Sequence, residues 1–426
     1  MNTDETDLER ERAHVPLLKQ LGPGLITGAA DDDPSGIATY SQAGAQFGYG
    51  LLWSVFFTTP LMIGIQIVSA RIGRVTGHGL AANIRERFPK PVLYFIVGLL
   101  VFANTINIAA DLGAMGDAMV LIIGGNSSVY IVFFALLSLV LQIFIPFPRY
   151  APFLKVLTLA LFAYVGTLLV VHTPFQALTD TVIPTLSWDK SYVSMLVAVL
   201  GTTISPYLFF WQASQEVEEQ RATPGHEPLR EAPEQAKAHF RRIKIDTYVG
   251  MTLSNVIALC IMLTTAAILH TAGVTQIDSA AQAAEALRPL AGDFAFLLFA
   301  AGIVGTGLLA VPILAGSAAY AVAETFRWRI GLGLTLAEAR GFYSIVAAAT
   351  ILGVIIDLSG IDSIKALIVA AIVNGIVSVP IMVVLMLMVT DPAVMGPFVA
   401  RRRLKRLGWL ATGVMAAAVG AMFLLM

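Results

Sequence analysis

The stretch from Gly24 to Gly44 reads "GLITGAADDDPSGIATYSQAG" and places the consecutive aspartates Asp31–Asp33 inside an otherwise apolar segment. Pro34 follows them directly, and a proline inside a helix removes a backbone donor and clashes with the preceding turn. Gly36 then makes unwinding inexpensive. The stretch therefore predicts a helix that is interrupted at the aspartates, where carboxylates and freed carbonyls converge on an ion.

The composition predicts that this break lies in a membrane. Of the 426 residues, 57% are hydrophobic and 13% are charged, whereas a soluble domain carries about 25% charged residues. The mean hydropathy is +0.77. The net charge of −1 does not indicate a nucleic-acid-binding protein. The chain is therefore expected to be a polytopic protein whose partner is the lipid bilayer.

The sequence contains no motif that is typical of an enzyme or of a redox protein. The single cysteine, Cys260, lies in an apolar run and excludes a disulfide framework or a cysteine metal cluster. The sequence contains no nucleophile elbow, zinc motif or P-loop, which argues against an enzyme and against a self-contained ATP-driven pump. We expect no cofactor.

The apolar runs predict an all-α membrane protein with eleven spans, because a membrane-crossing helix needs about 20 mostly apolar residues. The expected spans are 21–46, 50–70, 92–122, 129–147, 151–171, 191–215, 246–270, 294–324, 342–357, 365–389 and 407–425.

The basic residues predict the orientation of these spans. With the N-terminus inside, all but three of the 27 Lys and Arg residues fall on the cytoplasmic side, the exceptions being Lys190, Arg288 and Lys365. The first 20 residues are charged and lack the apolar region of a signal peptide. We therefore expect a multi-pass protein of the cell (inner) membrane, with residues 1–20 as a cytoplasmic tail and the C-terminus outside.

The sixth expected span repeats the interruption of the first. Val197–Gln212 reads "VAVLGTTISPYLFFWQ", with Pro206 again following small and polar residues. Interrupted helices in corresponding positions of two halves indicate a transporter built from inverted repeats, whose substrate lies at mid-membrane. We therefore predict one transport domain with repeats at 21–171 and 191–389, followed by an eleventh helix at 407–425.

Three motifs resemble the Nramp family of divalent-metal transporters, which have the LeuT-type fold of five plus five helices. "GPGLITGAADDDPSG" at Gly22–Gly36 resembles the family's first span, "GTTISPY" at Gly201–Tyr207 its sixth and "AADLGAM" at Ala109–Met115 its third. Carried over by position, the resemblance implies a metal site made of Asp33, the carbonyl of Ala30, Gly36 at an asparagine position, Thr202, Ser205 at the methionine position and Asn374 as a tenth-span amide.

The resemblance also implies residues along the transport pathway. Tyr207 and Gln212 stand at the positions of two sixth-span histidines, and Asp111 is kept from a third-span pair whose glutamate position holds Ala114. Asp31 and Asp32 have four open roles: lining a vestibule, capping the half-helix, staying protonated because adjacent carboxylates resist joint ionisation, or binding the metal.

The departures from the family pattern favour a hard cation. The soft methionine ligand is replaced by the oxygen of Ser205, and oxygen ligands suit Mg²⁺ and Mn²⁺. The chain looks like an Nramp-related branch of magnesium transporters. The six histidines lie in tails, loops or span ends, so we expect uptake without tight proton coupling. A negative-inside membrane potential would drive this uptake, since each 100 mV is worth about 2.3 kcal/mol per charge.

Three other functions stay open at this point: a proton-coupled Mn²⁺ or Fe²⁺ transporter, a LeuT-type symporter of a small organic solute, and a membrane sensor that has lost transport.

Further polar residues carry expectations about packing. Asn104 and Asn107 are expected to form interhelical hydrogen bonds. The stretch 215–244 is expected to be a solvated connector, with Glu216, Glu218 and Glu219 in water. Glu324 is expected to pair with Arg327 three residues on.

Overall fold

The computed structural model describes residues 22–145, 149, 159–170 and 184–426. Its main helices are α3 (Pro23–Asp31), α4 (Pro34–Phe47), α5 (Leu52–Thr76), α6 (Leu80–Arg87), α7 (Lys90–Ile123), α8 (Ser127–Phe144), α10 (Phe162–Val170), α12 (Lys190–Thr203), α13 (Pro206–Ala222), α14 (Ala236–Thr265), α15 (Ala280–Glu285), α16 (Arg288–Ala291), α17 (Ala295–Phe326), α18 (Arg340–Asp357), α19 (Ser363–Thr390), α20 (Pro392–Met395) and α21 (Arg402–Leu425). A π-helical turn, η3 (Ala266–His270), continues α14, and short 3₁₀ turns are η1 (Leu159–Leu161), η2 (Pro233–Gln235), η4 (Gly292–Phe294) and η5 (Gly396–Phe398).

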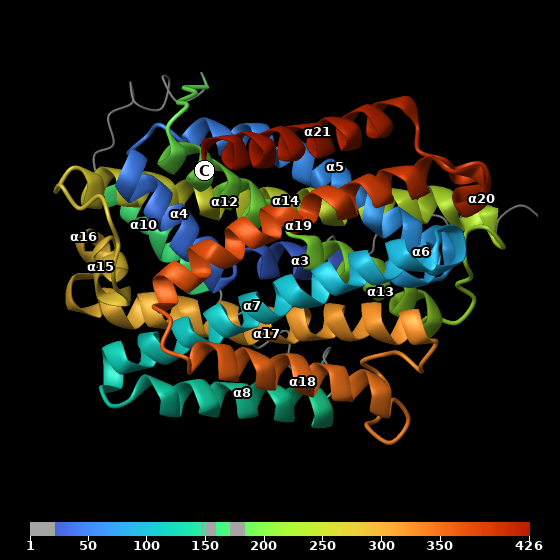
Figure 1. The fold of residues 1–426 in the computed structure, drawn as a ribbon, viewed down its shortest axis with the longest axis horizontal. Helices are drawn as coiled ribbons and strands as arrows, with labels where there is room; N and C mark the ends of the chain where they lie inside the picture. The colour runs from blue at the N-terminus through green and yellow to red at the C-terminus, as the bar shows by residue number, and fades with distance from the viewer. Residues whose placement is uncertain (1–21, 146–148, 150–158, 171–183) are drawn as a thin grey trace, which may run out of the picture.

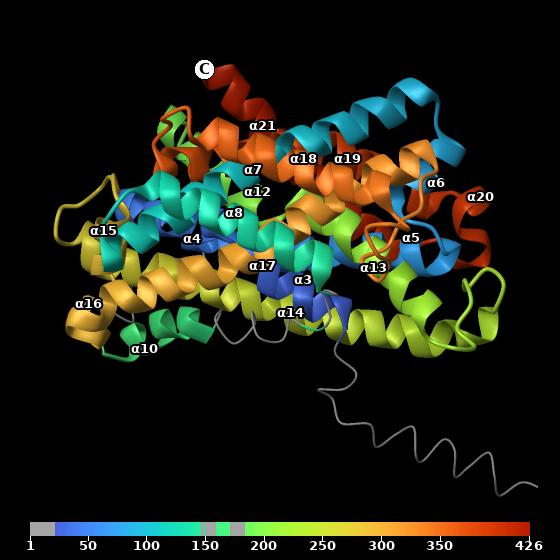
Figure 2. The same cartoon turned by 90° about the horizontal axis from the view of Figure 1, so that it is seen from below.

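The long helices run roughly along one axis of the molecule (Figure 1). One end, on the right of Figure 1, gathers α6, α20 and the starts of α14 and α21, and these segments carry many Lys and Arg residues. We call it the basic end. The opposite end carries α15 and α16, and the perpendicular view keeps this division (Figure 2).

The predicted all-α class is confirmed, and the described residues contain no strand. Nine helices in the described part of the chain are long and apolar enough to cross a membrane. The first expected span is present as the pair α3 and α4, and the fifth overlaps the shorter apolar helix 159–170. The expected tail 1–20 and the start of the fifth span, 151–158, lie outside the described residues.

Two glycines let α3 and α14 cross with their backbones in contact. A Cβ atom on Gly28 would lie 2.3 Å from the carbonyl oxygen of Gly250, and one on Gly250 would lie 2.3 Å from the carbonyl oxygen of Gly24. Only glycine allows helices to approach this closely, and small residues at such crossings are typical of membrane bundles. The first half-helix is therefore packed against the seventh span.

The second broken helix is joined to α19 in a similar way. A Cβ atom on Gly201 would lie 2.1 Å from the carbonyl oxygen of Ala371 and 2.5 Å from the backbone nitrogen of Gly375. Ser378 Oγ on α19 also donates a hydrogen bond of 2.8 Å to the carbonyl oxygen of Ile204, which the break leaves without a helical partner. This interaction satisfies a carbonyl that burial would otherwise penalise.

The expectation of solvated glutamates at the end of the sixth span was wrong. α13 continues to Ala222, so the connector before α14 is shorter than expected. Glu216 is buried and pairs with Arg242, which also pairs with Glu219 at 2.8 Å. Glu218 accepts hydrogen bonds from the Tyr320 hydroxyl and from the backbone N–H of Leu332. These carboxylates have protein partners because α14 and α17 pack against α13.

The expected pairing of Glu324 with Arg327 was also wrong. The Glu324 carboxylate instead accepts a hydrogen bond of 3.0 Å from the backbone N–H of Ala82, at the start of α6. Arg327 adopts a left-handed conformation that ends α17. A carboxylate at a helix N-terminus is stabilised by the unpaired N–H groups there, which explains the preference for α6.

Candidate cation site between two broken helices

The first break is organised by Asp33, which caps the N-terminus of α4. Its Oδ1 atom accepts hydrogen bonds from the backbone N–H of Gly36 at 2.7 Å and from the Ser35 hydroxyl at 2.8 Å. Pro34 occupies the first helical position, where the missing N–H costs nothing. The Asp-Pro-Ser-Gly sequence thus starts a new helix and fixes one carboxylate oxygen, while Oδ2 faces the neighbouring helices.

The second break is organised by Ser205, between α12 and α13. Its hydroxyl donates to the carbonyl oxygens of Gly201 at 3.1 Å and Thr202 at 2.8 Å, so it satisfies the end of α12. Pro206 then opens α13 at its first helical position. The predicted interruptions of the first and sixth spans are therefore present.

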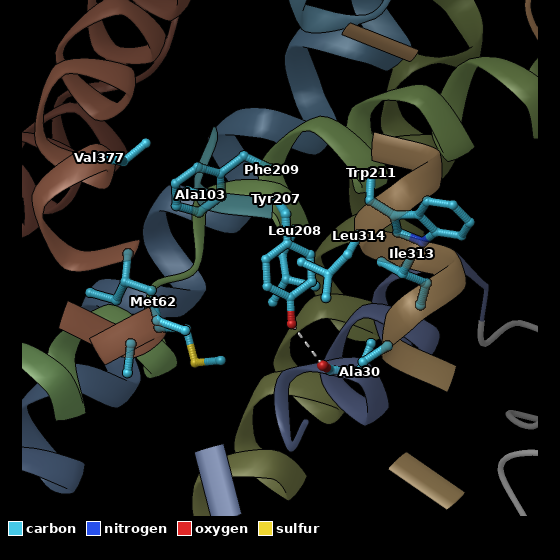
Figure 3. Packing of buried hydrophobic residues seen from close by; sticks show 14 of the residues in the cluster. Ala30, Met62, Ala103, Tyr207, Leu208, Phe209, Trp211, Ile313, Leu314 and Val377 are labelled. Atoms are coloured by element: carbon cyan, nitrogen blue, oxygen red, sulfur yellow. Dashed lines mark hydrogen bonds between the residues drawn. The ribbon is translucent and has the colours of Figure 1, made fainter. Parts of the chain in front are cut away.

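Tyr207 connects the two breaks. Its hydroxyl donates to the carbonyl oxygen of Ala30 at 2.9 Å (Figure 3). The same hydroxyl lies 3.2 Å from Asp33 Oδ2. Asn107 on α7 donates to the same Asp33 oxygen at 3.0 Å. Two predicted ligands, the carbonyl of Ala30 and the carboxylate of Asp33, therefore lie side by side, with the tyrosine hydroxyl between them.

Oxygen atoms from both broken helices also converge on Gly36. A Cβ atom at this position would lie 3.2 Å from the carbonyl oxygen of Asp31, 3.2 Å from Thr202 Oγ1 and 3.5 Å from Asp33 Oδ1. Thr202 Oγ1 is buried and makes no hydrogen bond. A side chain on residue 36 would press on these oxygens, so glycine keeps them accessible to one another.

Asp31 and Asp32 lie at the end of α3 and share one partner. The Ser254 hydroxyl on α14 lies 2.7 Å from Asp31 Oδ2 and 3.1 Å from Asp32 Oδ1. Both aspartates are buried, and Asp31 Oδ1 has no hydrogen-bond partner. Their side chains lie beside the break and not on the water-exposed surface of the protein.

Asp111 on α7 adds a fourth carboxylate to this region. It is fully buried and close enough to Asp33 for the two charges to interact. It faces the backbone N–H of Ser35, yet neither of its oxygens accepts a hydrogen bond of ordinary geometry. A buried carboxylate without such partners is costly unless a cation or a proton compensates it.

The described residues supply no basic partner to any of these four aspartates, since none of the ion pairs among them includes Asp31–Asp33 or Asp111. In the same part of the chain, no three His, Cys, Asp or Glu side chains converge closely enough to hold a metal by themselves. Any bound cation would therefore also need hydroxyl, carbonyl, amide or water oxygens.

The remaining predicted site residues fall into two groups. Asn374 lies one turn before Ser378 on α19 and so close to the second break, and its side-chain amide has no hydrogen-bond partner. Gln212 lies farther along α13, where it accepts from Gln66 at 2.5 Å and donates to Thr247 at 3.2 Å. Asn374 thus joins the site region, and Gln212 belongs to a hydrogen-bonded layer beside it.

Asn104 and Asn107 form interhelical hydrogen bonds, as predicted. Asn104 donates to the carbonyl oxygen of Leu314 and to Ser317 Oγ, both on α17. Asn107 donates to Asp33, which makes it part of the site itself.

Two residues of this region were missed from the sequence. Ser254 sits in the polar pair "SN" within an otherwise apolar span, and that pair was the available signal. Asp246 accepts hydrogen bonds from the backbone N–H groups of Gly22, Gly24 and Leu25 at 3.0, 2.6 and 3.0 Å. It thereby caps α3 from a distant part of the chain, which no local pattern could indicate.

A hollow of about 530 Å³ opens at the opposite end of the bundle and is acidic. Its lining includes Asp117, Asp278, Asp357 and Asp362. A smaller internal space shares Asp117 with this hollow and reaches Ile37, Ala38 and Ser41 on α4. Ile37, Ala38 and Ser41 of α4 therefore lie between the first break and the acidic hollow.

Comparison with known proteins assigns the family. Residues 24–425 match the family model for Nramp, described as natural resistance-associated macrophage protein-like. The chain belongs to the Nramp family. The match includes both breaks and runs from α3 to α21.

Solved structures of other transporters share the fold. A crystal structure of the Eremococcus coleocola manganese transporter, in complex with an aromatic bis-isothiourea substituted compound, is similar with a TM-score of 0.76 at 17% identity. The alignment covers 96% of this chain and 88% of that one. A crystal structure of a point mutant of that transporter gives a TM-score of 0.73 at 18% identity, covering 95% of this chain and 87% of that one.

A nucleobase-cation-symport-1 family transporter, in a closed conformation with bromovinylhydantoin bound, is similar with a TM-score of 0.59 at 13% identity. The alignment covers 95% of this chain and 92% of that one. The predicted LeuT-type architecture is thereby confirmed for the Nramp chain, whose family and structural neighbours are transporters.

Proposed function

We propose that this Nramp protein moves divalent metal cations, Mg²⁺ most readily and Mn²⁺ as well, into the cytoplasm by alternating access. The single observation that supports this best is the group of four buried aspartates beside the two breaks, which has no basic partner among the described residues. A buried negative region of this kind favours a cationic substrate.

The chemistry of the proposed ligands favours a hard cation. Asp33, the carbonyl of Ala30, Thr202, Ser205 and Asn374 offer oxygen atoms and no thiolate, thioether or imidazole. Mg²⁺ holds its water molecules strongly and is usually bound by one or two carboxylates together with water. Gly36 fits this proposal, because a side chain there would press on oxygens that the ion or its water molecules would contact.

The proposed direction follows from the distribution of basic residues. The positive-inside rule assigns the basic end to the cytoplasm and the acidic hollow to the outside. Asp117 and its neighbours in that hollow would then raise the local concentration of cations at the outer mouth. A negative-inside potential favours entry of a divalent ion by about 4.6 kcal/mol per 100 mV, twice the value for a single charge.

A second candidate, proton-coupled transport of Mn²⁺ or Fe²⁺, is favoured by Asp111 and Asp31. Oxygens of both carboxylates lack hydrogen bonds of ordinary geometry, and a proton would neutralise the charge in the cation-free state. Release of that proton on cation binding would couple the two fluxes.

Uptake into proteoliposomes under a negative-inside potential tests both candidates. Mg²⁺ and Mn²⁺ reporters and a pH-sensitive dye are read together for the wild type, for Asp33→Ala and for the control Asp293→Ala, an exposed aspartate outside the acidic hollow. We expect Mg²⁺ entry that Asp33→Ala abolishes, that Asp293→Ala retains, and that occurs without lumenal acidification. Mn²⁺ entry with acidification would support the second candidate. Entry of neither ion would contradict the proposal and leave a small organic cation as the substrate to test.

A further inference from the structure

A groove of about 1110 Å³ lies at the basic end, between α5, α14 and α21. The face that α14 turns toward it carries Lys237, Phe240, Lys244 and Tyr248, which are spaced three to four residues apart and therefore share one side of the helix. The groove is distinct from the cation site, since none of its lining residues belongs to either break.

The charged lining of the groove is strongly unbalanced. Six basic residues and one acidic residue, Glu234, line it, the basic ones being Arg71, Lys237, Lys244, Arg401, Arg402 and Arg403. Among the ion pairs of the described residues, none includes any of these six. Their positive charge is therefore available to an external anion.

Arg71 is half-buried, whereas the other five basic residues of the groove are exposed. Its guanidinium lies over the ring of Phe240, 4.2 Å from the centroid, and donates to the carbonyl oxygen of Phe398 at 3.0 Å. Its Nε atom is buried and has no hydrogen-bond partner. The side chain is thus held in place by α14 and by η5 while retaining an unused donor.

The rest of the groove is apolar and continues along a candidate membrane span. Ile63, Ile67, Leu404 and Leu407 form walls below the basic residues. Tyr248 is 46% exposed and lies about four helical turns after the start of the candidate span Pro233–His270, which contains α14. A ligand that fits this lining has an anionic head and apolar chains.

We propose that this groove binds an anionic phospholipid of the leaflet at the basic end, with its phosphate against the basic rim and its acyl chains along the apolar walls. Basic pockets between transmembrane helices are suited to anionic headgroups, and each basic residue near the surface attracts anionic lipid. Bound in this way, the lipid connects three parts of the predicted architecture. These are α5 in the first repeat, α14 in the second repeat and α21, the eleventh helix.

Native mass spectrometry of the full-length protein tests this proposal. The protein is titrated with phosphatidylglycerol and with phosphatidylcholine of the same acyl chains. A groove variant, Lys237→Gln/Lys244→Gln/Arg403→Gln, is compared with a matched control, Arg241→Gln/Lys405→Gln/Arg406→Gln. The control removes the same charge from the same two helices at positions that do not line the groove.

We expect the wild type and the control to bind phosphatidylglycerol in preference to phosphatidylcholine. The groove variant should bind phosphatidylglycerol at least about tenfold more weakly than the wild type does. Equal loss in both variants, or equal retention of the two lipids by the wild type, overturns the proposal. Displacement of phosphatidylglycerol by millimolar inorganic phosphate overturns it in favour of a soluble anion. A lipid-free dimer that disappears in the groove variant overturns it in favour of a second copy of the chain.

A second measurement does not depend on the charge variants. Tyr248→Trp in nanodiscs places a fluorophore in the groove, and the emission of the native tryptophans is subtracted. Brominated phosphatidylglycerol is expected to quench the added emission more strongly than brominated phosphatidylcholine at equal lipid content. Equal quenching by the two lipids contradicts a headgroup-specific site.

Discussion

The hydroxyl of Tyr207 donates to the carbonyl oxygen of Ala30 at 2.9 Å and so joins the second broken helix to the first. The same hydroxyl lies 3.2 Å from Asp33 Oδ2. The tyrosine hydroxyl thus satisfies the two oxygens that we propose as metal ligands and holds the two breaks together. A bound cation would have to compete with this hydroxyl for the Ala30 oxygen.

Tyr207→Phe should lower the KM for Mg²⁺ and lower the maximal rate. Without the hydroxyl, the Ala30 oxygen is unsatisfied in the empty protein, at a cost of about 1–3 kcal/mol. The cation then relieves this cost on binding, and return of the empty transporter becomes slower. Proteoliposome uptake over a range of Mg²⁺ concentrations measures both constants. A raised KM would instead identify the hydroxyl as a ligand.

Gly28→Ala should destabilise the protein and reduce uptake, because the new methyl group would overlap the backbone of Gly250. Overpacking of this kind costs about 1–3 kcal/mol. Thermal unfolding in detergent measures the change in Tm. The matched control is Gly420→Ala on α21, where the added methyl group meets open space. Equal Tm values for the two variants would show that α3 and α14 separate without cost.

Asp246→Ala should shift the protein toward a state open at the basic end. The carboxylate caps α3 with three hydrogen bonds, and a hydrogen bond to a charged group contributes about 1.5–3 kcal/mol. Its loss frees the half-helix. Labelling of Thr202→Cys, in a Cys260→Ser background, by an impermeant maleimide applied at the basic end should become faster. Asp293→Ala, an exposed change at the opposite end, should leave the labelling rate unchanged.

His226 should make stability pH-dependent near the basic end. Burial and the nearby Arg74 guanidinium hold the pKa of His226 below its ordinary value of 6.5. The unfolded chain therefore binds a proton before the folded protein does, and stability falls as the pH drops below about 6.5 toward the lowered pKa. His226→Gln should show a smaller loss of Tm between pH 7 and pH 5. An unchanged pH profile would mean that the histidine is free of Arg74 in solution.

Most of the fold could be predicted from the sequence because its signals are local and large. A run of about 20 apolar residues is a sufficient signal for a span, and a proline after polar residues is a sufficient signal for a break. Both predicted breaks occur, at Asp32–Asp33 and at Ile204–Ser205. The end of the sixth span was placed too early because the glutamates beyond it find partners on α14 and α17, which local polarity does not reveal.

Residues of the candidate site could be predicted only where they belong to a recognisable sequence motif. Asp33, Thr202 and Ser205 were predicted from the two interrupted spans and from the resemblance to the family, whereas the closeness of Asp33 and Thr202 to Gly36 required the three-dimensional structure. Ser254 and Asp246 lie more than 200 residues from the aspartates or glycines that they contact. Such partners depend on how α14 packs against α3, and no periodicity or spacing within either segment encodes that contact.

The oxygen atoms around Gly36 belong to two different pairs of helices, each pair joined by a crossing at glycines. Asp31 belongs to α3, which packs on α14 through Gly28 and Gly250, and Thr202 belongs to α12, which packs on α19 through Gly201 and Gly375. A displacement of one pair of helices relative to the other would separate these oxygens and disrupt the proposed cation site. Opening the pathway and releasing the ion would then be a single mechanical event.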